Sequence, residues 1–159
     1  MKSFKRETMK LFFPGSFDPF TTGHADLVER ALNLGCHVVI AIGINEEKKP
    51  LFSTAQRLEA IRSHYKGYSN VSVIEYDGLT VDAVRANGCT AILRGIRSMT
   101  DFEKERNLAE INRSIDGIET VLMVTSADVQ YVSSSMVREL ISFGRPVDDY
   151  VIDTFRNLI

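Results

Sequence analysis

The stretch MKLFFPGSFDPFTTGHADLVERALNLGCHVVIAIG, residues 9–43, sets the architecture that we expect for the whole chain. A short apolar run (9–13) is followed by a helix-period segment (24–34) that stops at Gly35, and then by a second apolar run (37–43). Glycine commonly follows the last turn of a helix. Apolar runs that are nearly continuous are typical of parallel strands covered on both faces. The stretch therefore predicts a strand, a helix and a second, parallel strand.

The same alternation continues to the end of the chain. Further strands are predicted at 71–75, 90–94 and 119–125, and further helices at 54–66, 80–87, 101–115, 134–143 and about 148–158. Two capping boxes support helix starts, one from Ser53 to Gln56 and one from Thr100 to Glu103. The apolar positions of the 101–115 helix are Leu108, Ile111 and Ile115. Strand–helix alternation of this kind predicts an α/β fold, a Rossmann-like doubly wound five-stranded parallel sheet with helices on both faces.

Length and composition indicate one globular domain. The chain has 159 residues, 44% of them hydrophobic and 25% charged, which is enough for a core without disulfides or a structural metal. We expect a single domain over 1–159, with 1–8 as a polar extension. The net charge of −2 gives no electrostatic reason for a nucleic-acid or membrane partner. No apolar run has the length of a membrane span, and the N-terminus does not fit a signal peptide. Cys36 and Cys89 are expected to be free thiols in a reducing cytoplasm.

Polar clusters follow four of the predicted strands. They are PGSFDPFTTGH (14–24), NEEKKP (45–50), RGIRS (94–98) and SADVQYVSSS (126–135). Ligands of open α/β sheets bind outside the carboxyl ends of the strands, so one pocket could collect all four clusters. In the first cluster, a turn exposes backbone N–H groups and the Ser16 hydroxyl, and His24 introduces a helix whose N-terminus favours anions. These features predict a phosphate-binding site.

The first cluster also carries a resemblance to a known family. GSFDPFTTGH (15–24) resembles the T/HxGH signature of the nucleotidyltransferase superfamily. Together with KKPLF (48–52), RGIRSMTDFEKE (94–105) and SSSMVRE (133–139), it is similar to the phosphopantetheine adenylyltransferase family from about residue 10 to the end. The resemblance implies that the adenylyl group of ATP is transferred to 4′-phosphopantetheine, which yields dephospho-CoA and pyrophosphate.

The residue chemistry agrees with that reaction. A phosphate monoester is largely ionised near pH 7, because its second pKa is about 6, so the attacking group needs no general base. The site must then align two phosphorylated molecules and stabilise negative charge with cations, hydroxyls and helix N-termini. The four clusters contain groups of all three kinds.

The resemblance implies a role for each site residue. His24 would stabilise the transition state at the α-phosphate, and the acceptor would be bound by Ser16, Lys48, Thr80 and Arg94. The expected ATP contacts are Ser16, Phe17, His24, Gly95, Ile96, Arg97, Glu105, Val129, Gln130, Tyr131, Val132, Ser133, Ser134 and Ser135. Mg²⁺ would enter with the substrate phosphates, since the sequence has no dedicated metal site. The family also implies a homohexamer, with CoA as a feedback ligand.

Several of these residues have purely structural alternatives. His24 could be a surface or helix-capping histidine, and Lys48 and Lys49 could form a solvated turn. Arg94 and Arg97 could form salt bridges with Asp101 or Glu103. The other structural alternatives are a surface carboxylate for Glu105 and helix N-caps for Ser133, Ser134 and Ser135. Asp18 is expected to be a loop-ordering carboxylate and not a metal ligand, and His37 and His64 are expected to be structural or surface histidines.

Other functions are also open at this point. A nicotinamide mononucleotide adenylyltransferase or a glycerol-phosphate cytidylyltransferase usually has His at the position of Thr21 and lacks the KKP and RGIR motifs. A non-catalytic nucleotide-sensing module would be expected to lose His24, Lys48 or an arginine. The chain departs from the family at Thr22, which is commonly Asn, at Thr80, which is often Met, and at 148–153, which lacks an expected proline.

Overall fold

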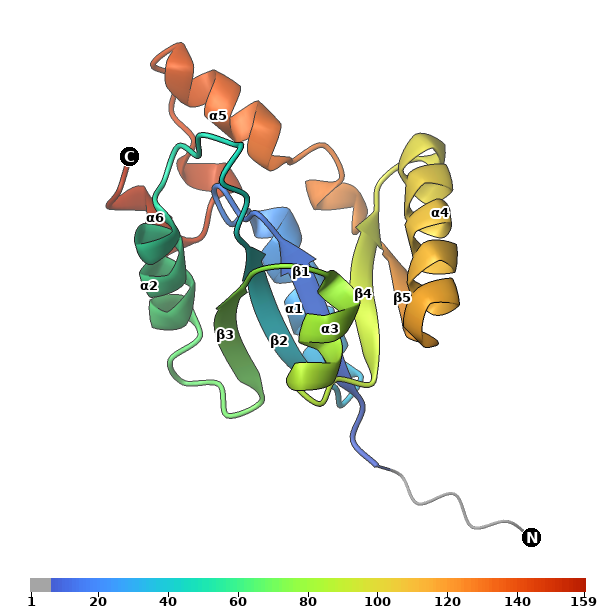
Figure 1. Ribbon diagram of the computed structural model, residues 1–159. Coiled ribbons are helices and arrows are strands. Elements are labelled where there is room, and N and C mark those ends of the chain that lie inside the picture. The colour runs from blue at the N-terminus through green and yellow to red at the C-terminus, as the bar shows by residue number, and fades with distance from the viewer. Residues whose placement is uncertain (1–6) are drawn as a thin grey trace, which may run out of the picture.

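A computed structural model describes residues 7–159 and contains one five-stranded sheet whose paired strands are all parallel. The strands are β1 (Lys10–Gly15), β2 (His37–Gly43), β3 (Val71–Tyr76), β4 (Ala91–Ile96) and β5 (Glu119–Val124), in the order β3-β2-β1-β4-β5 (Figure 1). The helices are α1 (Thr22–Asn33), α2 (Thr54–His64), α3 (Thr80–Ala86), α4 (Met99–Asp116), α5 (Ser134–Ser142) and the short α6 (Asp153–Arg156). The expected doubly wound α/β fold is confirmed. The predicted extension 1–8 lies mostly outside the described residues.

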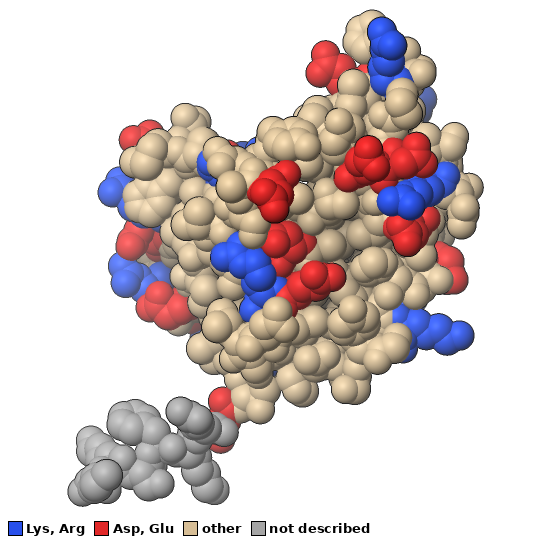
Figure 2. Space-filling model, turned by 180° about the vertical axis from the view of Figure 1, so that it is seen from behind, with Lys and Arg blue, Asp and Glu red and all other residues tan. Residues whose placement is uncertain are grey.

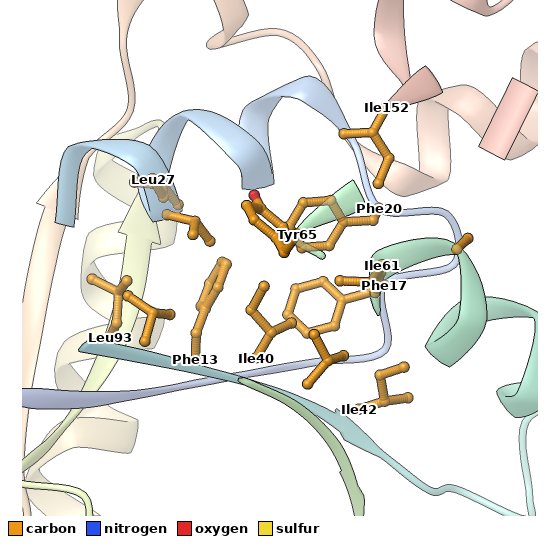
Figure 3. Close-up of a cluster of buried hydrophobic side chains, with 14 of the residues drawn as sticks. Phe13, Phe17, Phe20, Leu27, Ile40, Ile42, Ile61, Tyr65, Leu93 and Ile152 are labelled. Carbon is orange, nitrogen blue, oxygen red and sulfur yellow. The ribbon is translucent and has the colours of Figure 1, made fainter. Parts of the chain in front are cut away.

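The central strand β1 is buried on both faces because its side chains alternate between two apolar clusters. Leu11 and Phe13 belong to the cluster that includes side chains of α1, α2, α5 and α6, part of which is drawn in Figure 3. Phe12 belongs to the second cluster, with Val81 and Val84 of α3. In Figure 1, α3 lies in front of the sheet and α1 lies behind it. The edge strands β3 and β5 are only partly buried, because each has one neighbouring strand.

The sheet opens between β1 and β4. Strand β1 pairs with β2 over six residues, from Lys10 to Gly15, but with β4 only through Leu11–Ala91 and Phe12–Ile92. Beyond those two pairs the strands diverge toward their carboxyl ends, and this is the point where the strand order reverses. Arg94 spans the divergence by donating a hydrogen bond to the carbonyl of Pro14 at 2.9 Å. The sheet therefore provides an opening at the place where α/β proteins bind ligands.

The starts of α1, α4 and α2 can be compared with the predicted helix starts. Helix α1 begins at Thr22, so His24 lies inside its first turn. Helix α4 begins at Met99 with Ser98 as its N-cap, and the predicted Thr100–Glu103 capping box is wrong, because the Ser98 hydroxyl already accepts from the Asp101 amide. The Ser53–Gln56 capping box of α2 is confirmed.

The predicted final helix at 148–158 is wrong. Residues Asp148–Tyr150 form a 3₁₀ turn, Val151 forms an antiparallel bridge with Thr21, and only Asp153–Arg156 is helical. The bridge requires extended backbone at Val151, and it interrupts the helix that the side-chain pattern indicated.

The apolar positions of α4 are exposed in part, and Leu108 also lines a cavity at the end of the sheet. Leu108, Ile111 and Ile115 are 41%, 52% and 55% exposed, whereas Glu105 is only 6% exposed. Helix α4 packs its Glu105 side, and not its isoleucines, against the end of β4, where Arg94 pairs with Glu105.

Over residues 7–159, no helix is long and apolar enough to cross a membrane. Acidic and basic side chains are interspersed on the face of the molecule that is turned away from the viewer in Figure 1, as Figure 2 shows.

Candidate active site

Two adjoining cavities lie at the carboxyl ends of the strands. One, of about 490 Å³, is lined by His24 and by side chains of α4 and α5, and we call it the histidine cavity. The other, of about 370 Å³, is lined by Tyr76 and Thr80, and we call it the tyrosine cavity. Six residues line both cavities and mark where they meet: Pro14, Gly15, Ser16, Lys48, Arg94 and Glu105. The junction lies at the opening between β1 and β4.

His24 is held by the first turn of α1. The backbone amide of Thr21 donates to Nδ1 of His24 at 3.0 Å, and the Thr21 hydroxyl accepts from the backbone amide of His24 at 3.3 Å. This is a capping box in which an imidazole takes the place of the usual Glu or Gln side chain. Because Nδ1 accepts from a backbone N–H, the neutral ring carries its proton on Nε2. The arrangement fixes both the ring and its tautomer.

Aromatic rings surround this imidazole. The ring centroids of Phe17 and Phe20 lie 5.0 and 5.2 Å from that of His24, and Phe13 lies at 6.1 Å. Burial lowers the pKa of His24 from 6.5 to about 3, with a further contribution from the positive charges of Arg94 and Arg97. His24 is therefore a neutral N–H donor at pH 7 in the free protein.

The loop after β1 adopts an unusual backbone geometry at Phe17. Phe17 is only 2% exposed and has a φ of 47°, in the left-handed region that non-glycine residues seldom adopt. A Cβ atom at Gly15 would lie 2.9 Å from the Phe17 ring. Glycine at position 15 therefore leaves space for the Phe17 ring, which packs against the rings of Phe13 and Phe20.

Arg94 and Glu105 form a bidentate ion pair in the site. Nε and Nη2 of Arg94 each donate to one carboxylate oxygen of Glu105 at 2.8 Å. The partner of Arg94 is thus Glu105, and neither Asp101 nor Glu103, which were the alternatives from sequence. This bidentate pair holds the guanidinium at the junction of the cavities. It also engages both oxygens of Glu105, and the ATP contact predicted for that residue stays a prediction.

Arg97 and the serine run, Ser133, Ser134 and Ser135, also line the histidine cavity. Arg97 lines the cavity and lies 3.4 Å from Asp101, so the salt bridge considered for it does form. Ser133 is the N-cap of α5, as the structural alternative proposed, and its hydroxyl accepts from the Met136 amide. The Ser134 hydroxyl donates to the Pro19 carbonyl at 2.8 Å. All three serines line the cavity.

The remaining predicted residues are distributed over three places. Lys48 is exposed at the junction, and Thr80 lies in the tyrosine cavity with its hydroxyl 3.1 Å from that of Tyr76. Val132 lines the histidine cavity. Gln130 and Tyr131 line a third, open cavity that shares Arg97 and Asp101 with it.

Two of the predicted ATP contacts, Ile96 and Val129, do not line any of these three cavities, which are formed by residues in the described range 7–159. Gly95 lines the histidine cavity, and a Cβ atom there would collide with a terminal methyl of Leu27, so a larger residue would require the Leu27 side chain to move.

Sequence reasoning missed several polar residues that line the cavities, among them two basic residues, Arg138 and Lys104. Arg138 lies in the histidine cavity, three residues after Ser135 on α5, and Asp101 and Lys104 line it from α4. Asn112 lines the tyrosine cavity from α4, seven residues after Glu105 and therefore on the same face. Helical spacing from residues already singled out would have found Arg138 and Asn112.

No group of three metal-binding side chains occurs in the part of the chain that the structure describes. The two carboxylates of the histidine cavity, Asp101 and Glu105, are each paired with an arginine. The donor set does not fit a resident metal, although it does not conflict with a metal that arrives on a substrate's phosphates.

Comparison with known proteins identifies the family. A cytidylyltransferase-like family model matches residues 12–140. The chain is 55% identical over 143 residues to the phosphopantetheine adenylyltransferase of Porphyromonas gingivalis, covering 90% of this chain and 94% of that one. The chain belongs to the phosphopantetheine adenylyltransferase family. A second family member, from Phocaeicola vulgatus, is 46% identical over 89% of this chain and 94% of its own.

Solved structures support the fold. A bifunctional NMN adenylyltransferase/ADP ribose pyrophosphatase from Francisella tularensis superposes with a TM-score of 0.70 at 17% identity, covering 91% of this chain and 45% of that chain. A lipopolysaccharide core biosynthesis protein from Thermoplasma volcanium has a TM-score of 0.54 at 20% identity, over 76% of this chain and 98% of its own. At these identities the likeness concerns the fold alone, and it places this member of the phosphopantetheine adenylyltransferase family among Rossmann-like proteins.

Proposed function

We propose that this protein transfers the adenylyl group of MgATP to 4′-phosphopantetheine and releases dephospho-CoA and pyrophosphate. One observation carries the proposal: two cavities meet at a junction that holds Ser16, Lys48 and Arg94, and His24 faces only one of them. Such an arrangement suits two phosphorylated molecules that meet end to end. The protein is a nucleotidyltransferase, in agreement with the relatives that it matches over most of its length.

ATP occupies the histidine cavity in this proposal. The α-phosphate lies at the junction, where Nε2–H of His24 donates to one of its oxygens, and the Ser16 hydroxyl contacts a phosphate. The β- and γ-phosphates extend toward Arg97, Arg138 and the N-terminus of α5, where backbone amides favour anions. These groups stabilise the charge that develops on the departing pyrophosphate. Mg²⁺ enters bound to the triphosphate and not to a site of the chain.

4′-Phosphopantetheine occupies the tyrosine cavity, with its phosphate at the junction. Lys48 and Arg94 neutralise that phosphate, and an oxygen of it attacks the α-phosphorus of ATP while the bond to the bridging oxygen of pyrophosphate breaks. Asn112, Tyr76 and Thr80 supply polar groups for the amides of the pantetheine arm. CoA carries the same arm, and we expect it to compete for this cavity as a feedback ligand.

We further propose a homohexamer located in the cytoplasm. The exposed Ile111 and Ile115 of α4 give an apolar surface on this helix, and such surfaces commonly mark subunit contacts. Both cysteines are free thiols, as expected in a reducing compartment.

The deciding experiment is an incubation with ATP, Mg²⁺ and 4′-phosphopantetheine in which both pyrophosphate and dephospho-CoA are measured. Formation of the two products in equal amounts supports the proposal. Pyrophosphate release with nicotinamide mononucleotide as acceptor, and none with 4′-phosphopantetheine, would favour the rival adenylyltransferase. Binding of ATP without turnover of either acceptor would favour a sensing module.

A further inference from the structure

Two buried charged residues, Asp18 and Arg57, join the loop after β1 to the segment that follows Lys48. Asp18 is 6% exposed and Arg57 is 4% exposed. Charged side chains are rarely buried so deeply unless hydrogen bonds satisfy them, so the geometry around each is closely specified. Neither residue has a role in the chemistry described above.

Asp18 binds the end of this segment through its carboxylate. Its carboxylate oxygens accept from the backbone amides of Leu51 and Phe52, each at 2.8 Å. Both bonds cross from the loop after β1 to the last residues before α2. Asp18 is thus the loop-ordering carboxylate that was considered from sequence, and the loop that it orders is the one that carries Lys48.

Arg57 binds the loop after β1 and the residues around the start of α2. Its Nε donates to the Phe52 carbonyl at 3.0 Å, its Nη1 donates to the Ser16 carbonyl, and its Nη2 donates to the Thr54 hydroxyl at 3.1 Å. Burial lowers the pKa of Arg57, and the nearby Asp18 charge opposes that shift. We call Asp18 and Arg57 together the loop clamp.

The loop clamp fixes one end of an otherwise exposed segment. Residues 44–50 are all exposed, and the other end of the segment is held where the Ile44 amide donates to the Tyr76 carbonyl. Lys48 lies three residues before Leu51, the first residue that the clamp holds. The clamp also holds the carbonyl of Ser16, which lines the junction together with Lys48.

We propose that Asp18 and Arg57 are positioning residues that set Lys48 against Ser16, and so align the acceptor phosphate with the α-phosphate of ATP. The proposal rests on the proposed function for the identity of the two phosphates. It predicts that weakening the clamp impairs use of the acceptor more than use of ATP, because His24, Arg97 and the serine run are held by other contacts.

The kinetic test uses Asp18→Asn, Arg57→Gln and Arg57→Lys in the full chain. Asn keeps the shape of Asp18 but can accept from only one of the two amides, and Lys keeps the charge of Arg57 without its fork. We expect a lower kcat/KM for the acceptor, by about 10- to 100-fold for Asp18→Asn and Arg57→Gln and less for Arg57→Lys. The KM for ATP should change by less than about threefold, well below the acceptor effect expected from misalignment. Arg62→Gln is the matched control, because Arg62 lies on the same helix and donates to the Val73 carbonyl away from the site.

A double-mutant cycle separates positioning from a general loss of stability. If the clamp acts through Lys48, then Lys48→Ala should cost less in the Asp18→Asn background than in the wild type. The proposal would be overturned if Lys48→Ala lowered kcat/KM for the acceptor by the same factor in the Asp18→Asn background as in the wild type. It would also be overturned if a folded clamp variant showed an equal rise in the KM for both substrates.

Proteolysis tests the clamp without any substrate. Cleavage between Lys48 and Lys49 by a lysine-specific protease, followed by mass spectrometry, should be faster in Asp18→Asn and Arg57→Gln than in Arg62→Gln. Equal cleavage rates would overturn the proposal even if the wild type made no dephospho-CoA. An inactive wild type with faster cleavage in the clamp variants would instead refute the proposed function alone.

Discussion

The backbone amide of Thr21 donates a hydrogen bond to Nδ1 of His24, and this single bond decides how the histidine can act. It leaves the proton of the neutral ring on Nε2, so His24 lines the cavity as a donor and not as a base. The same bond completes the cap of α1. The position of the imidazole is therefore set by the start of a helix, which folds by local rules.

Replacing His24 with Ala should slow the reaction while the fold stays intact. Loss of one preorganised donor to a developing negative charge typically lowers kcat by about 10² to 10³. Steady-state kinetics and thermal unfolding measure the two effects, and His37→Ala, an exposed histidine, is the control. An unchanged kcat would refute the role of His24.

The stability of the protein should depend on pH through His24. Its pKa in the folded state, about 3, lies below the unfolded value of 6.5, so the unfolded chain takes up the proton first as the pH falls. The contribution is absent above about pH 6.5 and becomes destabilising as the pH falls from there toward 3. At about pH 5 it amounts to no more than about 2 kcal/mol, and water in the cavity reduces it.

Urea unfolding at about pH 7 and about pH 5 measures this effect in the wild type and in His24→Gln. The pKa of His64 is also lowered by burial, and comparing the two proteins cancels its contribution. An equal loss of unfolding free energy in both proteins would show that the imidazole of His24 is not desolvated.

Lys48→Ala should weaken the use of 4′-phosphopantetheine. Lys48 lines the junction of the cavities, where the acceptor phosphate lies in the proposed function. A charge-assisted hydrogen bond contributes about 1.5–3 kcal/mol, which corresponds to a rise of about 10- to 150-fold in the KM for the acceptor. Lys49→Ala is the control. A selective loss of ATP affinity would mean that the two substrates occupy the opposite cavities.

Glu105→Gln separates two roles of that residue. The amide cannot accept both guanidinium bonds of Arg94, and unfolding free energy should fall by about 1–3 kcal/mol. If the residue acts by holding Arg94, the KM for the acceptor rises. If it contacts ATP, the KM for ATP rises instead. Glu103→Gln, at an exposed position of the same helix, should change none of these quantities.

Ile111→Asp should disrupt the proposed homohexamer. A carboxylate at this position, which is 52% exposed on α4, would have to be desolvated in an apolar subunit contact. Sedimentation at micromolar concentration should show six times the chain mass for the wild type and smaller species for the variant. Arg106→Ala makes the same change in net charge at an exposed position on another face of α4 and tests whether charge alone is responsible. A monomeric wild type would refute the hexamer.

Local patterns predicted most of the fold because buried parallel strands have a continuous apolar signature. Strand β2 was predicted at its observed bounds, Ser53 is the expected helix cap, and Gly35 has the positive φ expected of a glycine that ends a helix. The 148–158 helix failed because a long-range bridge, from Val151 to Thr21, outweighs the local pattern.

Part of the site was predicted because the strands were predicted correctly. Strand exits brought His24, Lys48, Arg94 and the serines to one edge of the sheet, as the parallel topology requires. The partner of Arg94 was not predictable, because Glu105 lies eleven residues away and its approach depends on how α4 packs. Arg57 was missed for another reason: it belongs to a regular helix, and nothing in its surroundings in the sequence indicates that it reaches Ser16.

The brief ladder between β1 and β4 makes distant core positions matter for chemistry. His24, Ser16 and Lys48 follow the β1–β2 side of the opening, and Arg94 and Arg97 follow the β4 side, so the two halves of the reaction centre are kept in register by Leu11–Ala91 and Phe12–Ile92. A conservative change of volume at Leu11 or Ala91 should alter the spacing of the halves and lower turnover before it unfolds the protein. Enzyme activity would then respond to packing at the amino-terminal ends of β1 and β4 more sensitively than the free energy of unfolding does.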